Sequence, residues 1–394
     1  MPVAPDILIL EAARTPIGSF LGSLSRVSPT ALGVHAARGA LARAKVDPER
    51  IDATFFGNVL QSAKDTVYLA RHVGLQAGVP EDRAALVVNR ACASGLEAIV
   101  QGAKALALDG ASFVLAGGAE AMSMTPYAMR GVRQGWKMVK SDVDDVLFSA
   151  LFDPMAGCSI GETVEHLAAD QGITREQADA AAVEGQARAA KAQAEGVYAE
   201  EIIPVAAGSR RRPVMVEVDE ALRPSTTKEG LAALPGLFEG GVNTAGNSCG
   251  LNDAAAAAVM ASASAANEAG LTPLGRVVSW ASVGVNPKLM GLGPIEASRK
   301  ALADAGLTVK DLDVVELNDS FAVQSIAVQR ALELDPATVN PNGGALALGH
   351  PMGATGVRLV QSALYQLRRT GGRYALATVC VGGGQGTAMV LERT

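Results

Sequence analysis

The sequence predicts an α/β protein made of two repeated halves, and two observations support this fold class. First, residues 40–44 recur as residues 301–305, and the same offset of 261 residues matches 113–116 with 374–377. Second, each copy has the order helix, strand, glycine turn, helix, strand, which is the alternation expected of stacked α/β layers. A constant offset that extends from helices into strands indicates a duplicated unit, since chance similarity between alanine-rich helices would end with the helices.

The repeat also predicts how the chain is divided. Residues 1–122 form a first half, residues 271–394 form a second half, and residues 248–270 complete the first half. Residues 123–247 resemble neither copy, because they carry more charge and less regular spacing. We predict an inserted loop domain there.

Two helices are predicted outside the two copies. One covers residues 174–195, because Thr174 suits an N-cap position and Glu176 and Gln177 follow in the first turn. The other covers the alanine-rich residues 250–269, which should lead the chain back to the first half.

The composition is that of an ordinary globular protein and excludes some classes of function. The 394 residues are enough for two or three domains, and 49% of them are hydrophobic and 19% charged. A formal net charge of -6 argues against nucleic acid as the main partner, because phosphate binding draws on a basic surface. Every apolar stretch is interrupted well before the ~18 residues that a membrane-spanning helix needs.

Cysteine usage and the first residues bear on localisation. Four cysteines, two of them in reactive-looking turns, fit a reducing compartment better than a disulfide framework. Residues 1–6 show neither a basic signal region nor an arginine-rich transit pattern, so we expect a cytoplasmic protein. The cysteines and histidines lack the spacing of metal ligands, and we expect no metal site.

Three glycine-framed segments hold the reactive side chains. Cys92 follows a strand-like run at 84–88 and precedes a helix-like stretch at 95–108, so it should lie where a helix begins and where a thiol pKa is lowered. His350 stands between a glycine and a proline, and Cys380 stands at the end of a predicted strand. Taken singly, the cysteine could be a small buried hydrophobe and the histidine structural. Because the two copies contribute different members, we predict an active site between the copies.

These segments occur in order with four others over essentially the whole chain, and together they resemble the thiolase family, the acetyl-CoA C-acyltransferases. The four others are RTPIGSF at 14–20, GGAEAMS at 117–123, NTAGN at 243–247 and NDSF at 318–321. The resemblance implies the thiolase fold, a layered αβαβα core whose inserted loop domain covers the coenzyme A site. Residues 57–61 and 68–75 are most similar to the mitochondrial type of 3-ketoacyl-CoA thiolase.

The resemblance implies a role for each reactive residue. Cys92 would carry the acyl group, and His350 would activate it and polarise the thioester carbonyl. Cys380 would exchange a proton with the carbon α to the thioester. Asn318 would fix a water that, with His350, holds the thioester oxygen, while the backbone N–H groups of Cys92 and Gly382 would form a second oxyanion site.

The resemblance also implies a substrate-binding wall, formed by Ile160, Arg223, Ala245, Cys249 and Phe321. The chain departs from the family pattern close to this wall. The family's Asn-Glu-Ala-Phe is Asn-Asp-Ser-Phe at 318–321, its His-Met-Gly is Ser-Ile-Gly at 159–161, and its Asn-Ala-Ser-Gly is Asn-Ser-Cys-Gly at 247–250. These departures leave open the acyl-chain preference and the support around Asn318. Cys249 could be a substrate contact or a packed replacement for serine.

The reaction implied is the cleavage of a 3-ketoacyl-CoA by coenzyme A, or the reverse Claisen condensation of acetyl-CoA, through an acyl group on Cys92. The family resemblance implies acyl-CoA and coenzyme A as substrates, no permanently bound cofactor, a place in fatty acid β-oxidation, and a homodimer or homotetramer. Two alternatives stay open. A decarboxylating ketoacyl synthase expects a histidine or asparagine in place of Cys380, and a non-catalytic acyl-CoA-binding member would hold the reactive residues without using them.

Overall fold

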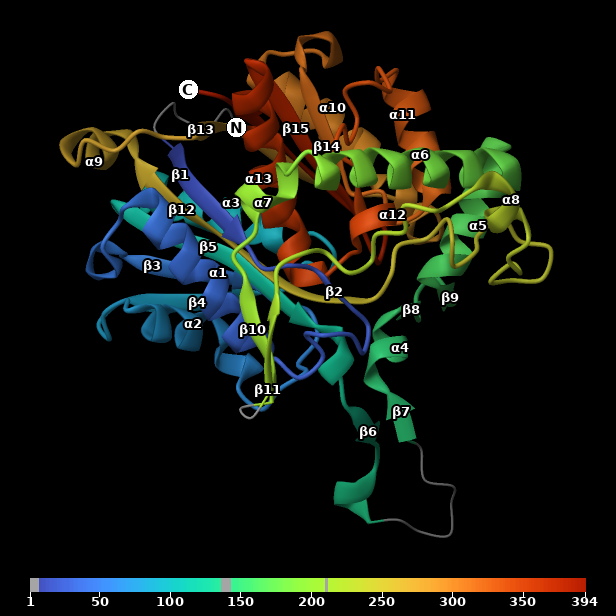
Figure 1. Ribbon diagram of the computed structural model, residues 1–394, viewed down its shortest axis with the longest axis horizontal. Helices are drawn as coiled ribbons and strands as arrows, with labels where there is room; N and C mark the ends of the chain where they lie inside the picture. The colour runs from blue at the N-terminus through green and yellow to red at the C-terminus, as the bar shows by residue number, and fades with distance from the viewer. Residues whose placement is uncertain (1–6, 136–142, 210–211) are drawn as a thin grey trace.

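The computed structural model describes residues 7–135, 143–209 and 212–394, and one large sheet runs through them (Figure 1). Its main path follows the order β14 (Val314–Leu317), β15 (Tyr374–Val381), β16 (Gln385–Glu392), β13 (Gly275–Gly284), β1 (Ile7–Arg14), β12 (Asn252–Ser262), β5 (Phe113–Ala121), β3 (Ala53–Gly57) and β4 (Ala84–Val88). The short β2 (Gly18–Ser19) pairs with β12 outside this path.

Helices lie between these strands in both halves, and α4 to α8 belong to the inserted region. Their bounds are α1 (Pro29–Ala44), α2 (Leu69–Ala77), α3 (Ser94–Leu108), α4 (Val146–Ala150), α5 (Ile160–Gln171), α6 (Arg175–Ala194), α7 (Val197–Glu201), α8 (Lys228–Ala232), α9 (Ala263–Glu268), α10 (Gly293–Ala305), α11 (Ala322–Leu332), α12 (Ala345–Leu348) and α13 (Met352–Thr370). Short 3-10 helices lie at Pro48–Arg50, Thr66–Tyr68, Met122–Met124, Val132–Gln134, Pro287–Leu292 and Val309–Asp311.

The sheet consists of two half-sheets that meet along a narrow contact. β1 and β13 share only two residue pairs, Leu8 with Arg276 and Ile9 with Gly275. From this contact outwards, one half-sheet runs β1, β12, β5, β3, β4 and the other runs β13, β16, β15, β14, where the isolated parallel bridge between Val315 and Val339 stands in the place of β4. The first four strands of the two orders correspond, as the repeat predicts.

Helices form three layers around the half-sheets. The apolar faces of α3 and α13 pack with strands of both half-sheets in one buried cluster, so these two helices form the central layer. A second cluster places α1 and α2 on the outer face of the first half-sheet, and a third places α10 and α11 on the outer face of the second. The predicted αβαβα layering is confirmed.

The alanine-rich run at 250–269 is not the predicted helix. It forms β12 and then the short α9. β12 is paired on one side with β1 and on the other with β5, and its residues are buried on both faces beneath α1 and α13. Small alanine side chains allow helices to pack closely on both faces, and this tertiary packing outweighs the helix propensity of alanine.

The inserted region lies between β5 and β12. Its strands are β6 (Tyr127–Met129), β7 (Val143–Asp145), β8 (Phe152–Asp153), β9 (Cys158–Ser159), β10 (Val205–Ser209) and β11 (Arg212–Val216). The helix predicted over 174–195 is confirmed as α6, where the Thr174 hydroxyl accepts the Gln177 N–H at 3.4 Å. Figure 1 shows β6, β7 and α4 extending away from the layered body.

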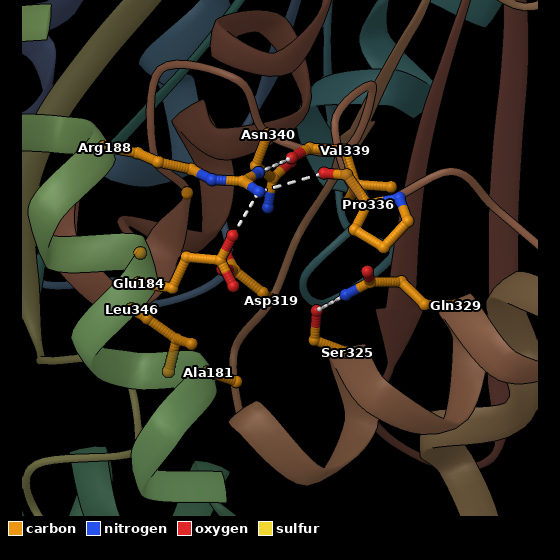
Figure 2. Close-up of a pocket in the computed structure, with 12 residues that line it drawn as sticks. Ala181, Glu184, Arg188, Asp319, Ser325, Gln329, Pro336, Val339, Asn340 and Leu346 are labelled. Atoms are coloured by element: carbon orange, nitrogen blue, oxygen red, sulfur yellow. Dashed lines mark hydrogen bonds and ion pairs between the residues drawn. The ribbon is translucent and has the colours of Figure 1, made fainter. Parts of the chain in front are cut away.

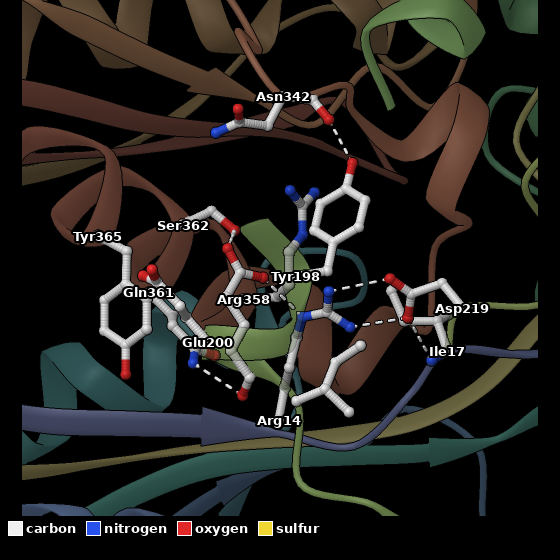
Figure 3. Close-up of polar contacts among 12 residues, drawn as sticks. Arg14, Ile17, Tyr198, Glu200, Asp219, Asn342, Arg358, Gln361, Ser362 and Tyr365 are labelled. Atoms are coloured by element: carbon white, nitrogen blue, oxygen red, sulfur yellow. Dashed lines mark hydrogen bonds and ion pairs between the residues drawn. The ribbon is translucent and has the colours of Figure 1, made fainter. Parts of the chain in front are cut away.

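A buried polar network fixes the inserted region to both halves. At the end of β1, the guanidinium of Arg14 contacts both carboxylate oxygens of Asp219, at 2.8 and 2.9 Å (Figure 3). Its Nε donates to Glu201 at 2.8 Å. The Tyr198 hydroxyl donates to the carbonyl of Asn342 in the second half. Loss of one partner of such a buried pair typically costs about 3 to 5 kcal/mol, so the network holds the three parts in register.

In the part of the chain that the structure describes, none of the helices combines the length and the apolar character needed to cross a membrane. Residues 1–6, on which the expectation about targeting depends, lie outside the described residues.

Candidate active site

Cys92 lies on a sharp turn between β4 and α3. The preceding Ala91 has a φ of 42°, a left-handed conformation that costs a non-glycine residue about 1 to 2 kcal/mol. Asn89 Oδ1 accepts the Ala91 N–H at 2.9 Å. Ser94 Oγ accepts the Arg90 N–H at 2.9 Å and donates to the Ala91 carbonyl at 2.7 Å. These bonds hold Cys92 two residues before the start of α3, where a helix start was predicted.

The thiol of Cys92 does not have the lowered pKa that its place before a helix predicts. Burial raises the pKa of Cys92 to about 11, and the charge of Glu120 adds to the rise. The backbone N–H groups of Gly382 and of Cys92 itself hydrogen-bond the sulfur and act in the opposite direction. Desolvation outweighs these donors, so the thiol is protonated in the free protein and needs a base.

His350 offers an imidazole nitrogen suited to that task. Its Nδ1 lies 2.7 Å from Thr355 Oγ1, and this hydroxyl donates its own proton to the Pro351 carbonyl at 3.0 Å. Thr355 must then accept from Nδ1–H, which assigns the lone pair to Nε2. Nε2 is buried and has no partner among the described residues. Burial, assisted by the charge of Arg358, lowers the pKa of His350 to about 3, so the imidazole is neutral.

The turns that carry Cys92 and His350 come together where α3 and α13 begin. A Cβ at Gly356 would lie 2.1 Å from a backbone nitrogen of α3, and a Cβ at Gly95 would lie 2.9 Å from the Gly356 nitrogen. Only glycine permits two helices to approach this closely. Cys92 also packs against the buried cluster that contains Met352, two residues after His350.

Two buried polar side chains, to which the sequence analysis gave no role, hold these turns in place. Asn252 Oδ1 accepts the backbone N–H of His350 at 2.9 Å. Glu120 accepts the N–H groups of Gly353 and Leu60, each at 3.0 Å, and burial raises the pKa of this acid to about 7. Glu120 had a visible signal, since it is an acid inside the small, apolar run that forms β5. Asn252 had none.

Cys380 is the second-last residue of β15 and lies beside the segment that leaves β14. The backbone N–H of Asn318 donates to the Thr378 carbonyl at 2.9 Å. The side chain of Asn318 donates from Nδ2 to Ser320 Oγ at 2.7 Å, while its buried Oδ1 has no partner in the described chain. Burial, followed by the proximity of Cys92, raises the pKa of Cys380 to about 12, and Ser320 opposes the rise. Cys380 is therefore a neutral thiol that can supply a proton.

Gly382 reaches the sulfur of Cys92 from the turn after β15. Gly383 and Gly384 have φ values of 83° and 78°, a conformation that favours glycine and turns the chain into β16. A Cβ at Gly382 would lie 3.2 Å from Ile160 Cδ1. The first residue of α5 thus lies against the backbone that the sequence predicts as an oxyanion donor.

Cys249 is a third thiol in the same site. Its backbone N–H donates to the Ser320 carbonyl at 2.8 Å, and the residue before it forms a β-bridge with Phe321. Burial raises the pKa of Cys249, and the proximity of Cys92 and of Cys380 contributes to the rise. The structure therefore brings Cys249 and Phe321 to the segment that carries Ser320.

The other two predicted wall residues belong to the inserted region. The backbone N–H of Arg223 donates to Gln186 Oε1 in α6 at 2.8 Å. Ala245 is exposed on a turn in which Asn247 Oδ1 accepts the Thr244 N–H at 2.8 Å. These hydrogen bonds fix both segments to the inserted region and not to the turns that carry the thiols.

Asp319 connects the site to a small pocket beside α6 (Figure 2). Its carboxylate accepts the Ala345 N–H, and burial raises its pKa to about 6. Arg188 also lines the pocket, where it pairs with Glu184 and donates to the Val339 carbonyl at 2.5 Å. The three thiols are not among the residues that line this pocket.

The arrangement defines a class of site. A half-buried thiol, a buried thiol, a neutral imidazole with a free lone pair and two backbone N–H groups aimed at one sulfur suit acyl transfer through a cysteine, with the second thiol for proton transfer. In the described ranges, no cluster of three or more His, Cys, Asp or Glu side chains could hold a metal ion.

The comparisons with known proteins identify the family. The model of the thiolase N-terminal domain matches residues 7–264, and that of the thiolase C-terminal domain matches residues 271–393. The chain belongs to the thiolase family. It is 43% identical over 396 residues to the mitochondrial 3-ketoacyl-CoA thiolase of Mus musculus, with 100% of both chains covered. It is 44% identical over 390 residues to beta-ketothiolase BktB of Cupriavidus necator, with 98% of this chain and 99% of the relative covered.

Solved structures agree with this assignment. The structure of human mitochondrial 3-ketoacyl-CoA thiolase in complex with CoA superposes with a TM-score of 0.97 at 42% identity, covering 100% of this chain and 99% of that one. The Bacillus anthracis acetyl-CoA acetyltransferase superposes with a TM-score of 0.96 at 38% identity, covering 99% of each chain. The predicted similarity to the mitochondrial type is confirmed, and these relatives do not favour a ketoacyl synthase or a non-catalytic member.

Proposed function

We propose that this protein is an acyltransferase that cleaves 3-ketoacyl-CoA with coenzyme A, or condenses acetyl-CoA in reverse, through an acyl group on Cys92. One observation carries the proposal: Cys92, Cys380 and the lone pair of His350 Nε2 are supplied by two different halves and lie together in one site. The relative solved with CoA supports coenzyme A as a substrate.

The first half-reaction forms the acyl-enzyme. His350 Nε2 takes the proton of Cys92, and the thiolate attacks the 3-keto carbon of the substrate. The N–H groups of Cys92 and Gly382, which already point at the sulfur, receive the oxyanion that develops beside it, and each such donor is typically worth about 2.7 to 4 kcal/mol. The bond between C2 and C3 then breaks. Its electrons form the enolate of acetyl-CoA, and Cys380 protonates C2.

The second half-reaction releases the acyl group. The Cys380 thiolate takes the proton of free coenzyme A, and the resulting thiolate attacks the acyl carbon. Cys92 leaves as a thiolate and recovers its proton from His350, which restores the starting state. The unpartnered Oδ1 of Asn318 supports a water that, with the protonated Nε2, would hold the enolate oxygen.

The inserted region has a second proposed task. We infer that residues 123–247 cover the coenzyme A site, as the family resemblance implies, with Arg223 available for a phosphate. The segment that carries Arg223 is fixed to α6, and α6 packs on α11 and α12. Arg223→Ala should therefore raise KM for coenzyme A with little change in kcat.

We further infer a homo-oligomer. β4 is an edge strand with Leu86 48% exposed, and an exposed apolar edge strand is suited to pairing with a second copy. A second exposed apolar set comes from β6, from α4 and from β8 with the residues after it, and is formed by Tyr127, Met129, Phe148, Phe152 and Met155. The first surface supports a dimer and the second supports a tetramer, and light scattering would separate the two states.

The activity test is coenzyme A-dependent loss of acetoacetyl-CoA, measured beside 3-ketohexanoyl-CoA and 3-ketodecanoyl-CoA. We expect turnover of at least one of them, and the order of kcat/KM values gives the chain-length preference. If the folded protein turns over none of the three, the proposed activity is wrong and acyl-CoA binding without catalysis becomes the better hypothesis.

A further inference from the structure

Ser320 occupies a position between the second thiol and the asparagine of the site. Its side chain is buried, and its Oγ accepts a hydrogen bond from Asn318 Nδ2 at 2.7 Å. Its carbonyl accepts the backbone N–H of Cys249 at 2.8 Å. Ser320 lies three residues after Leu317, the last residue of β14, and Leu317 pairs with Thr378 of β15, which brings this segment close to Cys380. Ser320 thus contacts or adjoins three members of the site.

The hydrogen bonds that involve the Ser320 hydroxyl have a defined donor and acceptor order. A hydroxyl has one proton to donate and two lone pairs. Since Ser320 Oγ accepts from the Asn318 amide, its proton is available to the neighbouring sulfur of Cys380, whose pKa the Ser320 side chain lowers. The order is therefore amide N–H to hydroxyl oxygen, then hydroxyl O–H to sulfur.

This order also decides which end of the Asn318 amide faces the substrate. With Nδ2 on the serine side, the hydroxyl keeps its proton for Cys380, whereas an amide turned to place Oδ1 there would compete with Cys380 for that proton. Oδ1 is then directed elsewhere, and it is the buried atom of Asn318 that has no partner among the described residues.

We propose that Ser320 is a positioning residue that fixes the Asn318 amide with Oδ1 toward the substrate and hydrogen-bonds Cys380 when that thiol loses its proton. The proposal rests on the proposed function for its effect on turnover, but not for its effect on the thiol itself. The other titratable and charged groups around the two residues are Cys92, Cys249, Asp319, His350 and Arg358. Negative charge on Cys92 or Asp319 disfavours the Cys380 thiolate, and the hydroxyl of Ser320 acts against this repulsion.

The test compares two serine-to-alanine variants. Ser320→Ala should fold, because alanine is the residue that the family pattern has at this place. The matched control is Ser325→Ala, since Ser325 is also buried and also accepts from an amide, Gln329 Nε2 at 3.0 Å, but in the pocket of Figure 2. Alkylation of Cys380 by iodoacetamide is followed from pH 7 to 10 by mass spectrometry of its peptide. We expect a rate at least about tenfold lower in Ser320→Ala, which is the lower end of the effect of a hydrogen bond to a charged group, and no change in Ser325→Ala.

Two further readouts distinguish positioning from structural support. With a substrate that the wild type turns over, Ser320→Ala should lower kcat about tenfold with little change in KM. The alkaline limb of the pH profile of kcat should also move. Ser320→Thr should restore part of kcat. Equal Cys380 alkylation rates in the wild type and Ser320→Ala would overturn the proposal. If the wild type turns over no 3-ketoacyl-CoA while the alkylation rates still differ, the proposed function fails and the positioning role stands.

Discussion

The two halves of the molecule share one fold and contribute different chemistry. At the offset of 261 residues, the first half has Asn89, Cys92 and Ala119 where the second half has His350, Gly353 and Cys380. Each reactive residue is therefore matched by a residue that does not share its role. The duplication provides two equivalent glycine turns at the starts of α3 and α13. One turn carries the nucleophile Cys92 and the other carries His350, while the second thiol, Cys380, lies at the end of β15.

Packing explains why the two turns could not remain identical. A Cβ at Gly353 would lie 2.7 Å from the carbonyl oxygens of both Ala119 and Gly57. A cysteine at Gly353, the counterpart of Cys92, would displace the backbone that holds the site. The close contact that brings the halves together thus excludes a second nucleophile at the equivalent place.

The largest expected effect comes from removing the nucleophile, which the first half contributes. Cys92→Ala should lower kcat/KM for 3-ketoacyl-CoA by about 10⁴-fold or more, because no acyl-enzyme can form. Mass spectrometry after incubation with acetyl-CoA should show an added acetyl group on the wild type and none on the variant. An acetylated Cys92→Ala protein would mean that the nucleophile lies elsewhere.

The next largest effect comes from removing the second thiol, which the second half contributes. Cys380→Ala should lower turnover about 10² to 10⁴-fold, the range for loss of a general acid or base. This variant should still become acetylated at Cys92, but it should lose the exchange of the α-protons of acetyl-CoA with deuterium oxide. Retained exchange in Cys380→Ala would remove the proton-transfer role from this thiol.

A change at the contact between the halves should affect stability. Gly356→Ala places a methyl group 2.1 Å from a backbone nitrogen, so we expect a loss of about 3 kcal/mol in the free energy of unfolding, near the upper end for overpacking. Chemical denaturation measures it. Gly284→Ala is the control, since nothing lies within 4 Å of a Cβ there. Equal losses in the two variants would show that the close approach of α3 and α13 is not required.

The smallest expected effect sharpens the role of His350. Thr355→Val removes the acceptor that fixes Nδ1–H, so both tautomers should be populated and kcat/KM should fall about tenfold. Nitrogen NMR of labelled histidine should show His350 as one neutral tautomer from pH 5 to 8 in the wild type, because its pKa is lowered to about 3. Titration of His350 near pH 6.5 would contradict this assignment.

The lowered pKa of His350 also predicts how its contribution to stability depends on pH. The folded pKa of His350 lies below its ordinary value of 6.5, so the folded state binds fewer protons than the unfolded state between these values. The contribution of His350 to stability should therefore be present above about pH 6.5 and be lost as the pH falls towards 3. His350→Gln should reduce this part of the acid sensitivity.

The sequence by itself determined the duplication, the α/β alternation, the cap of α6 at Thr174 and the grouping of Cys92, His350 and Cys380 in glycine turns. Those features are local patterns or repeats of local patterns, and elementary rules of capping, periodicity and turn chemistry are enough to find them. The roles of these residues stay predictions until the variants are measured.

Only the tertiary structure decided the rest. The alanine run of β12 became a strand because two neighbouring strands and two helices enclose it, and the pKa of Cys92 is raised because burial outweighs the donors at its turn. The links from Asn252 to His350 and from Glu120 to Gly353 join residues far apart in the chain. Burial and long-range hydrogen bonds depend on which segments meet, and no local pattern in one sequence records that.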